Sequence, residues 1–86
     1  MRIYYSSKFS KEYKALPLAV KKKAEEKELL FRKDPFDARL KSHKLKGSLH
    51  EYWAFSIDIR HRIIFEFANN NTIWFHSVGD HSIYDI

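Results

Sequence analysis

Residues 51–67 read "EYWAFSIDIRHRIIFEF" and carry the clearest structural signal in the chain. In the first half of this stretch the large apolar residues alternate with smaller or polar ones, and they are Trp53, Phe55, Ile57 and Ile59. A period of two places such side chains together on one face of a β-strand. A second apolar run, "RIIFEF" at 62–67, follows almost at once. The stretch therefore predicts two successive strands.

A third strand is predicted directly after them. The segment "NNN" at 69–71 is a turn signal, because asparagine tolerates the left-handed backbone that a hairpin turn needs. The next run, "TIWFHSV" at 72–78, is again rich in strand-forming residues and leads into Gly79. Three successive strands with short turns predict a mainly antiparallel sheet.

The N-terminal part of the chain changes to a helical period. A short strand is predicted for "RIYY" at 2–5, and either Ser6 or Ser7 can cap the helix that follows. Pro17 ends that helix and, since proline is tolerated in a first helical turn, opens a second one. The apolar residues of the first helix recur near helical spacing, and they are Phe9, Tyr13 and Leu16.

The second helix is predicted to end before "DPF" at 34–36. Its inward residues are expected to be Val20, Ala24 and either Leu30 or Phe31. The resulting order, β-α-α-β-β-β, predicts an α+β fold over residues 1–86 as a single domain. A two-helix hairpin would pack on one face of a small, mainly antiparallel four-stranded sheet.

The composition limits the classes of protein that fit. A chain of 86 residues with 44% hydrophobic residues suits one small core. It contains no cysteine, which excludes disulfides and thiolate zinc sites, and its two glycines provide no glycine-rich phosphate loop. The N-terminal segment has no apolar run long enough for a signal peptide or a membrane helix. We therefore expect a cytoplasmic protein without membrane association.

Positive charge is concentrated in the first half of the chain. Residues 1–50 hold fourteen Lys and Arg against six Asp and Glu, whereas residues 51–86 hold two against five. Lys and Arg contacts with phosphates release counterions, so such a surface favours nucleic acid. A lysine-rich helix such as "KKKAEEKE" at 21–28 is equally typical of a solvated face. Charge alone leaves both interpretations open.

Polar groups are expected to converge at one end of the sheet. If the helices cover one face, the other face is free for polar residues, and the last strand ends beside it. The segment "HKLKG" at 43–47 leads into the neighbouring strand. The residues that can meet there are His43, Lys44, Lys46, Arg62, His81 and Tyr84.

Three segments together carry a resemblance to a known family: "HKLKG" at 43–47, "YWAFSIDIRHRIIFEF" at 52–67 and "VGDHSIY" at 78–84. On a short chain with a preceding helical hairpin, they resemble the RelE/ParE superfamily of bacterial toxins, and in particular its YafQ-like and YoeB-like mRNA-cleaving branches. The resemblance implies a RelE-like fold and a ribosome-dependent endoribonuclease that blocks translation. It also implies an acidic antitoxin, encoded by the adjacent gene, as partner, with the ribosome and mRNA as targets.

The resemblance also implies roles for individual residues. His43 stands where YafQ-like toxins have a histidine and YoeB-like toxins a glutamate, and it is expected to transfer a proton. Arg62 matches the arginine that contacts the scissile phosphate. His81 matches the C-terminal histidine of the YafQ and YoeB branches, and Tyr84 falls near the aromatic residue used around the substrate nucleotide. We expect RNA contacts from Lys44, Lys46, Arg60 and His61.

Some positions depart from the family pattern. YafQ-like toxins carry a further histidine and an aspartate where this chain has Ser56 and Arg60, and RelE has two strand lysines where this chain has Trp53 and Phe55. The departures place more of the chemistry on His43, Arg62 and His81.

The proposed chemistry has its own physical logic. Cleaving RNA through its 2′-hydroxyl needs a base, a cation beside the phosphate and an acid for the leaving 5′-oxygen. Histidine can serve as base or acid near neutral pH, and arginine donates paired hydrogen bonds to phosphate. No cofactor or metal is needed, and no histidine pair has zinc-site spacing. Two alternatives stay open: a ParE-like toxin that binds DNA gyrase, and a degenerate, inactive toxin fold.

Overall fold

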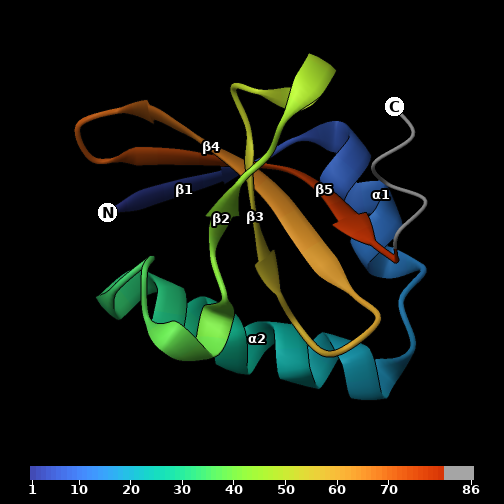
Figure 1. Ribbon diagram of the computed structural model, residues 1–86. Coiled ribbons are helices and arrows are strands. Elements are labelled where there is room, and N and C mark those ends of the chain that lie inside the picture. Colours follow the sequence, from blue (N-terminus) through green and yellow to red (C-terminus); the bar gives the residue numbers. More distant parts are fainter. Residues whose placement is uncertain (81–86) are drawn as a thin grey trace.

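The structure is a computed structural model that describes residues 1–80. The helices are α1 (Ser7–Lys14) and α2 (Leu18–Lys33), with short 3₁₀ turns η1 (Ala38–Leu40) and η2 (Gly47–Leu49). The strands are β1 (Arg2–Tyr5), β2 (His43–Lys44), β3 (Trp53–Ser56), β4 (Arg62–Asn69) and β5 (Thr72–Gly79). This arrangement confirms the predicted α+β class (Figure 1).

All five strands form one sheet in the order β1-β5-β4-β3-β2. β1 runs parallel to β5, while the other neighbouring pairs are antiparallel. Four strands match those expected from the sequence, and β2 is an additional fifth. It pairs His43 with Ala54 and Lys44 with Trp53. A ladder of two residues has no hydrophobic period, so pattern analysis could not find it.

The helical hairpin begins and ends where local signals predict. The hydroxyl of Ser6 accepts a hydrogen bond from the backbone N–H of Phe9 at 2.9 Å and caps α1. Pro17 is the N-cap residue of α2, which ends at Lys33, just before Asp34. In Figure 1 α2 runs along the bottom of the view and α1 lies beside β5. Among the described residues, neither helix is long and apolar enough to cross a membrane.

The hydrophobic core lies between the helices and one face of the sheet. Phe31 of α2 is fully buried, and its ring contacts those of Phe55, Phe65 and Phe75 at centroid distances of 5.0, 4.9 and 5.4 Å. The other core residues are Phe9, Val20, Ala24, Leu40, Ile57, Ile63, Ile73 and Val78. This packing confirms the inward positions expected for the second helix. We call the sheet face turned away from α1 and α2 the open face.

The expectation for Ile59 was wrong. Its side chain is 89% exposed instead of continuing the apolar face of β3. β3 ends at Ser56, and the Asp58 carboxylate accepts hydrogen bonds from the backbone N–H groups of Arg60 and His61 at 2.9 and 2.7 Å. Such an aspartate-centred turn reverses the chain before Ile59 can join the ladder.

Ser6 also joins α1 to the sheet, because its hydroxyl donates to the carbonyl oxygen of His76 at 2.8 Å. Ser6→Ala should lower the free energy of unfolding by about 0.5–2 kcal/mol, the usual cost of losing an N-cap. Urea unfolding followed by circular dichroism measures this change. Ser7→Ala, at the exposed first position of the same helix, is the matched control and should change stability little. Equal effects of the two substitutions would show that the cap contributes nothing specific.

Candidate functional site on the open face of the sheet

Strand register places His43 and Arg62 on the same face. His43 is paired with Ala54, which is paired with Ile64, while Ser56 is paired with Arg62. Directly paired residues of antiparallel strands point to the same side of a sheet. The intervening residues Phe55 and Ile63 belong to the core under the helices. His43 and Arg62 therefore both belong to the open face, two strands apart and in adjacent cross-strand rows.

The His43 ring is exposed and held by its own segment of chain. Its Nδ1 lies 3.0 Å from the carbonyl oxygen of Lys41. A carbonyl oxygen can only accept, so Nδ1 carries the proton in this contact. In the neutral ring, Nε2 is then the nitrogen with a free lone pair. The geometry presents His43 to the solvent as a proton acceptor.

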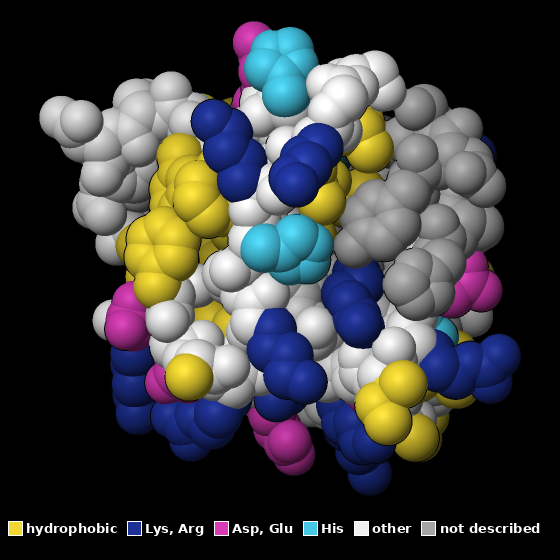
Figure 2. All heavy atoms as spheres, viewed as in Figure 1, with side chains coloured by type: hydrophobic (Ala, Val, Ile, Leu, Met, Phe, Trp, Pro, Cys, Tyr) yellow, Lys and Arg dark blue, Asp and Glu magenta, His cyan; other side chains and the backbone are white. Residues whose placement is uncertain are grey.

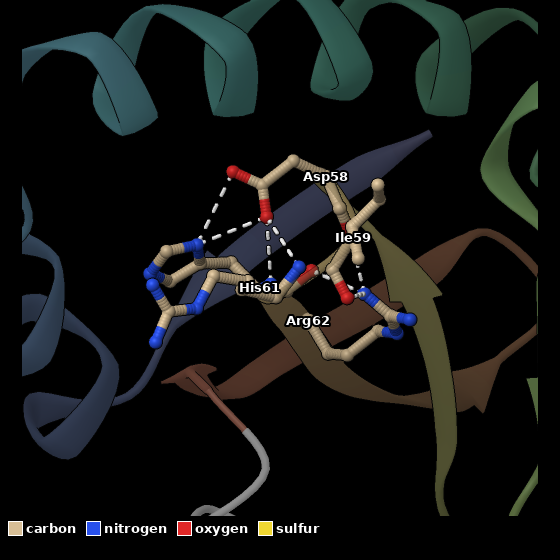
Figure 3. Close-up of polar contacts among 5 residues, drawn as sticks. Asp58, Ile59, His61 and Arg62 are labelled. Atoms are coloured by element: carbon tan, nitrogen blue, oxygen red, sulfur yellow. Dashed lines mark hydrogen bonds and ion pairs between the residues drawn. The ribbon is translucent and has the colours of Figure 1, made fainter.

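Arg62 is positioned by the loop between β3 and β4. Its Nη1 donates to the carbonyl oxygens of Asp58, Ile59 and His61, the last two at 3.3 and 3.0 Å (Figure 3). One guanidinium nitrogen thus holds the side chain against the loop. Among the described residues, Nε and Nη2 have no such partner, which leaves them available to donate to an anion.

Arg62 lines a basic pocket of about 340 Å³. Three further cations line it, and they are Lys27 of α2, Arg39 of η1 and Lys41, the residue that ends η1. Asp58 lines the pocket as well. Arg39 forms a bidentate pair with Asp37 at 3.0 and 2.8 Å, and its hydrogen bonds hold the pKa of Asp37 at about 2. Lys27, Lys41 and Arg62 remain against the single carboxylate of Asp58, so the pocket has a net positive charge. The pocket suits a phosphate group.

Lys27, Arg39 and Lys41 were not predicted as site residues. Lysine and arginine abound in the first half of the chain, so none of the three stood out from its neighbours. Lys41 reaches the pocket because it ends η1 in a left-handed backbone conformation, with φ of 53°. No local pattern signalled that position.

Comparisons with known proteins bear on this architecture. No family model and no curated protein sequence matches the chain. Solved structures match over nearly the whole length. A YoeB/ParE toxin from Agrobacterium tumefaciens has a TM-score of 0.80 and 18% identity, covering 94% of this chain and 99% of its own. YafQ from E. coli strain BL21(DE3) has a TM-score of 0.75 and 25% identity, covering 98% of both chains.

The E. coli DinJ-YafQ toxin-antitoxin complex also matches, with a TM-score of 0.72 and 26% identity. The match covers 94% of this chain and 92% of that one. The chain has the RelE/ParE-like toxin fold. The resemblance inferred from the three sequence segments is confirmed at the level of this fold.

Within the RelE/ParE-like fold, the predicted site residues are only partly brought together. Lys44 is exposed at the sheet edge and pairs with Trp53, so the register places it on the helix side, away from His43. Lys46 is exposed just before η2, and Arg60 is exposed in the loop between β3 and β4. His81 and Tyr84 lie outside the described residues. Figure 2 shows Lys and Arg side chains on both sides of a central histidine.

His61 is tied to Asp58. Its Nδ1 lies 2.9 and 3.2 Å from the two carboxylate oxygens, and the ring is partly buried (Figure 3). Burial raises the pKa of Asp58, but the hydrogen bonds from the His61 ring and from two backbone N–H groups outweigh it, so the pKa is lowered. Asp58 and His61 therefore shape the loop that holds Arg62.

Because the folded-state pKa of Asp58 is lowered, its charged form stabilises the fold above the ordinary aspartate pKa of about 4. That contribution is lost as the pH falls through the lowered pKa. Asp58→Asn should therefore be less stable than the parent at neutral pH, with the difference vanishing in acid. The urea midpoints of unfolding at neutral pH and in acid test this prediction, and Glu26→Gln, at an exposed position, is the control. A difference that persists in acid would exclude the charge as its cause.

The described residues hold no group of three or more histidine, cysteine or acidic side chains close enough to bind one metal ion.

Proposed function

We propose that this chain is the toxin of a type II toxin-antitoxin system and cleaves mRNA on the ribosome. The observation that carries the proposal is the open face itself. Within residues 1–80, an exposed histidine whose Nε2 has no hydrogen-bond partner and an arginine with two unpaired donor nitrogens lie in adjacent rows, and the arginine lines a basic pocket. RNA cleavage through the 2′-hydroxyl needs these two groups together.

In the proposed reaction, His43 Nε2 takes the proton of the 2′-hydroxyl. The 2′-oxygen then attacks the adjacent phosphorus, and the bond from phosphorus to the 5′-oxygen breaks. Arg62 donates to the phosphate oxygens as negative charge develops on them. His81, assigned by resemblance, protonates the departing 5′-oxygen, and Tyr84 lies beside the substrate nucleotide. The products are a 2′,3′-cyclic phosphate and a free 5′-hydroxyl.

The proposed partners follow from charge and from the related structures. Two of the similar solved structures are the DinJ-YafQ and YoeB-YefM toxin-antitoxin complexes. The net charge of +5 favours an acidic antitoxin that folds on binding, as well as RNA. Lys44, Lys46, Arg60 and His61 are the proposed RNA contacts. The site of action would be the cytoplasm, where ribosomes translate.

Single-turnover cleavage on programmed ribosomes tests the function. The rate should follow a bell-shaped pH profile, because one histidine must be neutral and the other charged. His43→Gln and His81→Gln should each slow cleavage by about 10²–10⁴-fold. His50→Gln is the matched control, since its exposed ring also has Nδ1 close to a carbonyl oxygen, that of Gly47 at 3.2 Å, but His50 directly follows η2.

Three results would overturn the proposal. Parent-rate cleavage by both His43→Gln and His81→Gln would remove the histidine chemistry. Growth arrest with DNA damage and intact mRNA would instead favour a gyrase-binding, ParE-like toxin. Expression without any effect on growth or translation would indicate an inactive fold.

A further inference from the structure

A row of aromatic rings crosses the open face beside the row that contains His43. Tyr4 stacks on Trp74 at 5.1 Å between centroids, and Trp74 lies parallel to His76 at 6.5 Å. Tyr52 meets His76 edge to face at 4.9 Å. We call Tyr4, Trp74, His76 and Tyr52 the aromatic row. It runs from β1 across β5 to the residue before β3.

These rings do not belong to the core. The core rings of Phe55, Phe65 and Phe75 are fully buried, whereas Trp74, His76 and Tyr52 are only partly buried and Tyr4 is 43% exposed. A β-bulge allows this arrangement, because Ile64 pairs with Ser77 but Phe65 pairs with Phe75, leaving His76 as the extra residue. The row therefore presents ring surface to the solvent.

The His76 ring is fixed in place by a carboxylate. Its Nε2 lies 3.0 Å from Glu66 Oε1, and both side chains are about 30% exposed, at 29% and 32%. On the backbone side, the carbonyl oxygen of His76 accepts from Ser6. These two contacts restrain the ring, which lowers the entropy lost when a ligand stacks against it.

A mainly apolar groove of about 380 Å³ lies against this end of the row. Ile64 and Ser77 contribute to it from the same cross-strand row as His43, and Tyr52 and His76 line it as well. Lys8 lines it from α1, with Nζ donating to the hydroxyl of Ser77 at 2.7 Å. The groove is within the usual size range of small-ligand sites.

We propose that this groove binds one unpaired base of the RNA substrate, stacked against Tyr52 and His76. The inference rests on the proposed function and adds the site that selects the nucleotide next to the cleaved bond. Three successive rows of the open face carry a cation, a histidine and aromatic rings, in that order. Adjacent rows are about 7 Å apart along a β-strand, so Arg62 and Tyr52, which are two rows apart, are separated by about 14 Å. A phosphate at Arg62 and a base at Tyr52 can therefore belong to nearby nucleotides of one RNA strand.

The choice of a nucleic-acid base over other apolar ligands follows from charge and ring geometry. Base stacking on exposed aromatic side chains beside a cationic track is the usual mode of single-strand binding. Here Lys8, whose Nζ also pairs with Glu12 at 2.8 Å, lines the groove itself, and Lys41 and Arg62 line the basic pocket at the end of the sheet where Arg62 lies.

The test uses two single-stranded oligonucleotides of equal length, both 2′-O-methylated so that neither can be cut. One carries bases, and the other is abasic with the same phosphates. The protein should bind the first about 5- to 150-fold more tightly in a fluorescence anisotropy titration, the range expected for one stacked base. Tyr52→Ala should remove most of this ratio while leaving the abasic affinity unchanged.

Two further variants separate stacking from folding. Tyr52→Phe keeps the ring and should restore the ratio. Phe36→Ala removes an exposed ring, 56% accessible, that packs on Trp53 and Phe67 and is not part of the aromatic row, so it should leave both affinities unchanged. Thermal unfolding of each variant shows that it is folded at the temperature of the titration.

Equal affinities of the parent for the two oligonucleotides would overturn the inference, as expected if a peptide partner were the only occupant of the groove. An unchanged ratio in Tyr52→Ala would overturn it as well. The outcome is independent of cleavage. If the protein prefers the base-bearing oligonucleotide but never cuts mRNA on ribosomes, the proposed function is refuted and base binding in the groove is supported. If it cuts mRNA without that preference, the proposed function is supported and base binding in the groove is refuted.

Discussion

Arg62→Ala should lower the rate of single-turnover mRNA cleavage on ribosomes by about 10²–10³-fold, the usual effect of removing one donor aimed at developing negative charge. Arg62 has Nη1 committed to three loop carbonyls, which among the described residues leaves Nε and Nη2 as its donors to a phosphate. Binding of the substrate should weaken less than the rate falls. The measurement is the rate at saturating protein, with binding measured separately.

Arg62→Lys separates charge from geometry. Lysine keeps the positive charge but lacks the planar guanidinium that donates to the three loop carbonyls and to a phosphate at once. We therefore expect Arg62→Lys to recover only part of the lost cleavage rate. Arg32→Ala is the control, because Arg32 lies on α2 and pairs with Glu28 at 3.3 Å. Full activity of Arg62→Ala would exclude Arg62 from the chemistry.

Phe31→Ala should be much less stable than the parent protein. Phe31 is 0% exposed and contacts Phe55, Phe65 and Phe75, so it joins α2 to the three central strands. Truncating a buried phenylalanine costs about 3–5 kcal/mol. A domain of 86 residues has a total stability on the order of 4 to 13 kcal/mol. The substitution therefore removes a large fraction of the whole.

Leu29→Ala provides the matched control for that loss. It lies on the same helix two residues away, with a side chain that is 64% exposed. Its effect on the free energy of unfolding should stay within about 0.5 kcal/mol. Urea unfolding, followed by both circular dichroism and tryptophan fluorescence, measures both variants. A Phe31→Ala protein as stable as Leu29→Ala would contradict the central role of the phenylalanine cluster.

Much of the secondary structure was predictable because its causes are local. Alternation of apolar residues identified β3, and a serine followed by helically spaced apolar residues identified α1. The prediction failed at Ile59, where hydrogen bonds to the Asp58 side chain end the strand although the alternation continues. It also missed β2, whose two residues pair only because β3 is beside them.

The candidate site was predictable only in part. The resemblance selected His43 and Arg62, and the register places both on the open face. The predicted roles of His81 and Tyr84, which lie outside the described residues, stay predictions. Lys44 was expected among the converging residues, yet its pairing with Trp53 puts it on the other side of the sheet. Neighbouring strand residues alternate between faces, so proximity in sequence to His43 was misleading.

The sequence by itself determined the helices, most strands, the apolar side of each and the types of residue available for chemistry. These properties depend on neighbours within a few positions, where backbone preferences and side-chain periodicity act. Only the tertiary structure decided that Lys27, Arg39 and Lys41 line the same pocket as Arg62. It also decided that Tyr52 and His76 line a groove one row from His43. Those contacts join residues far apart in the chain. They depend on strand register, a bulge and helix packing, which no local pattern specifies.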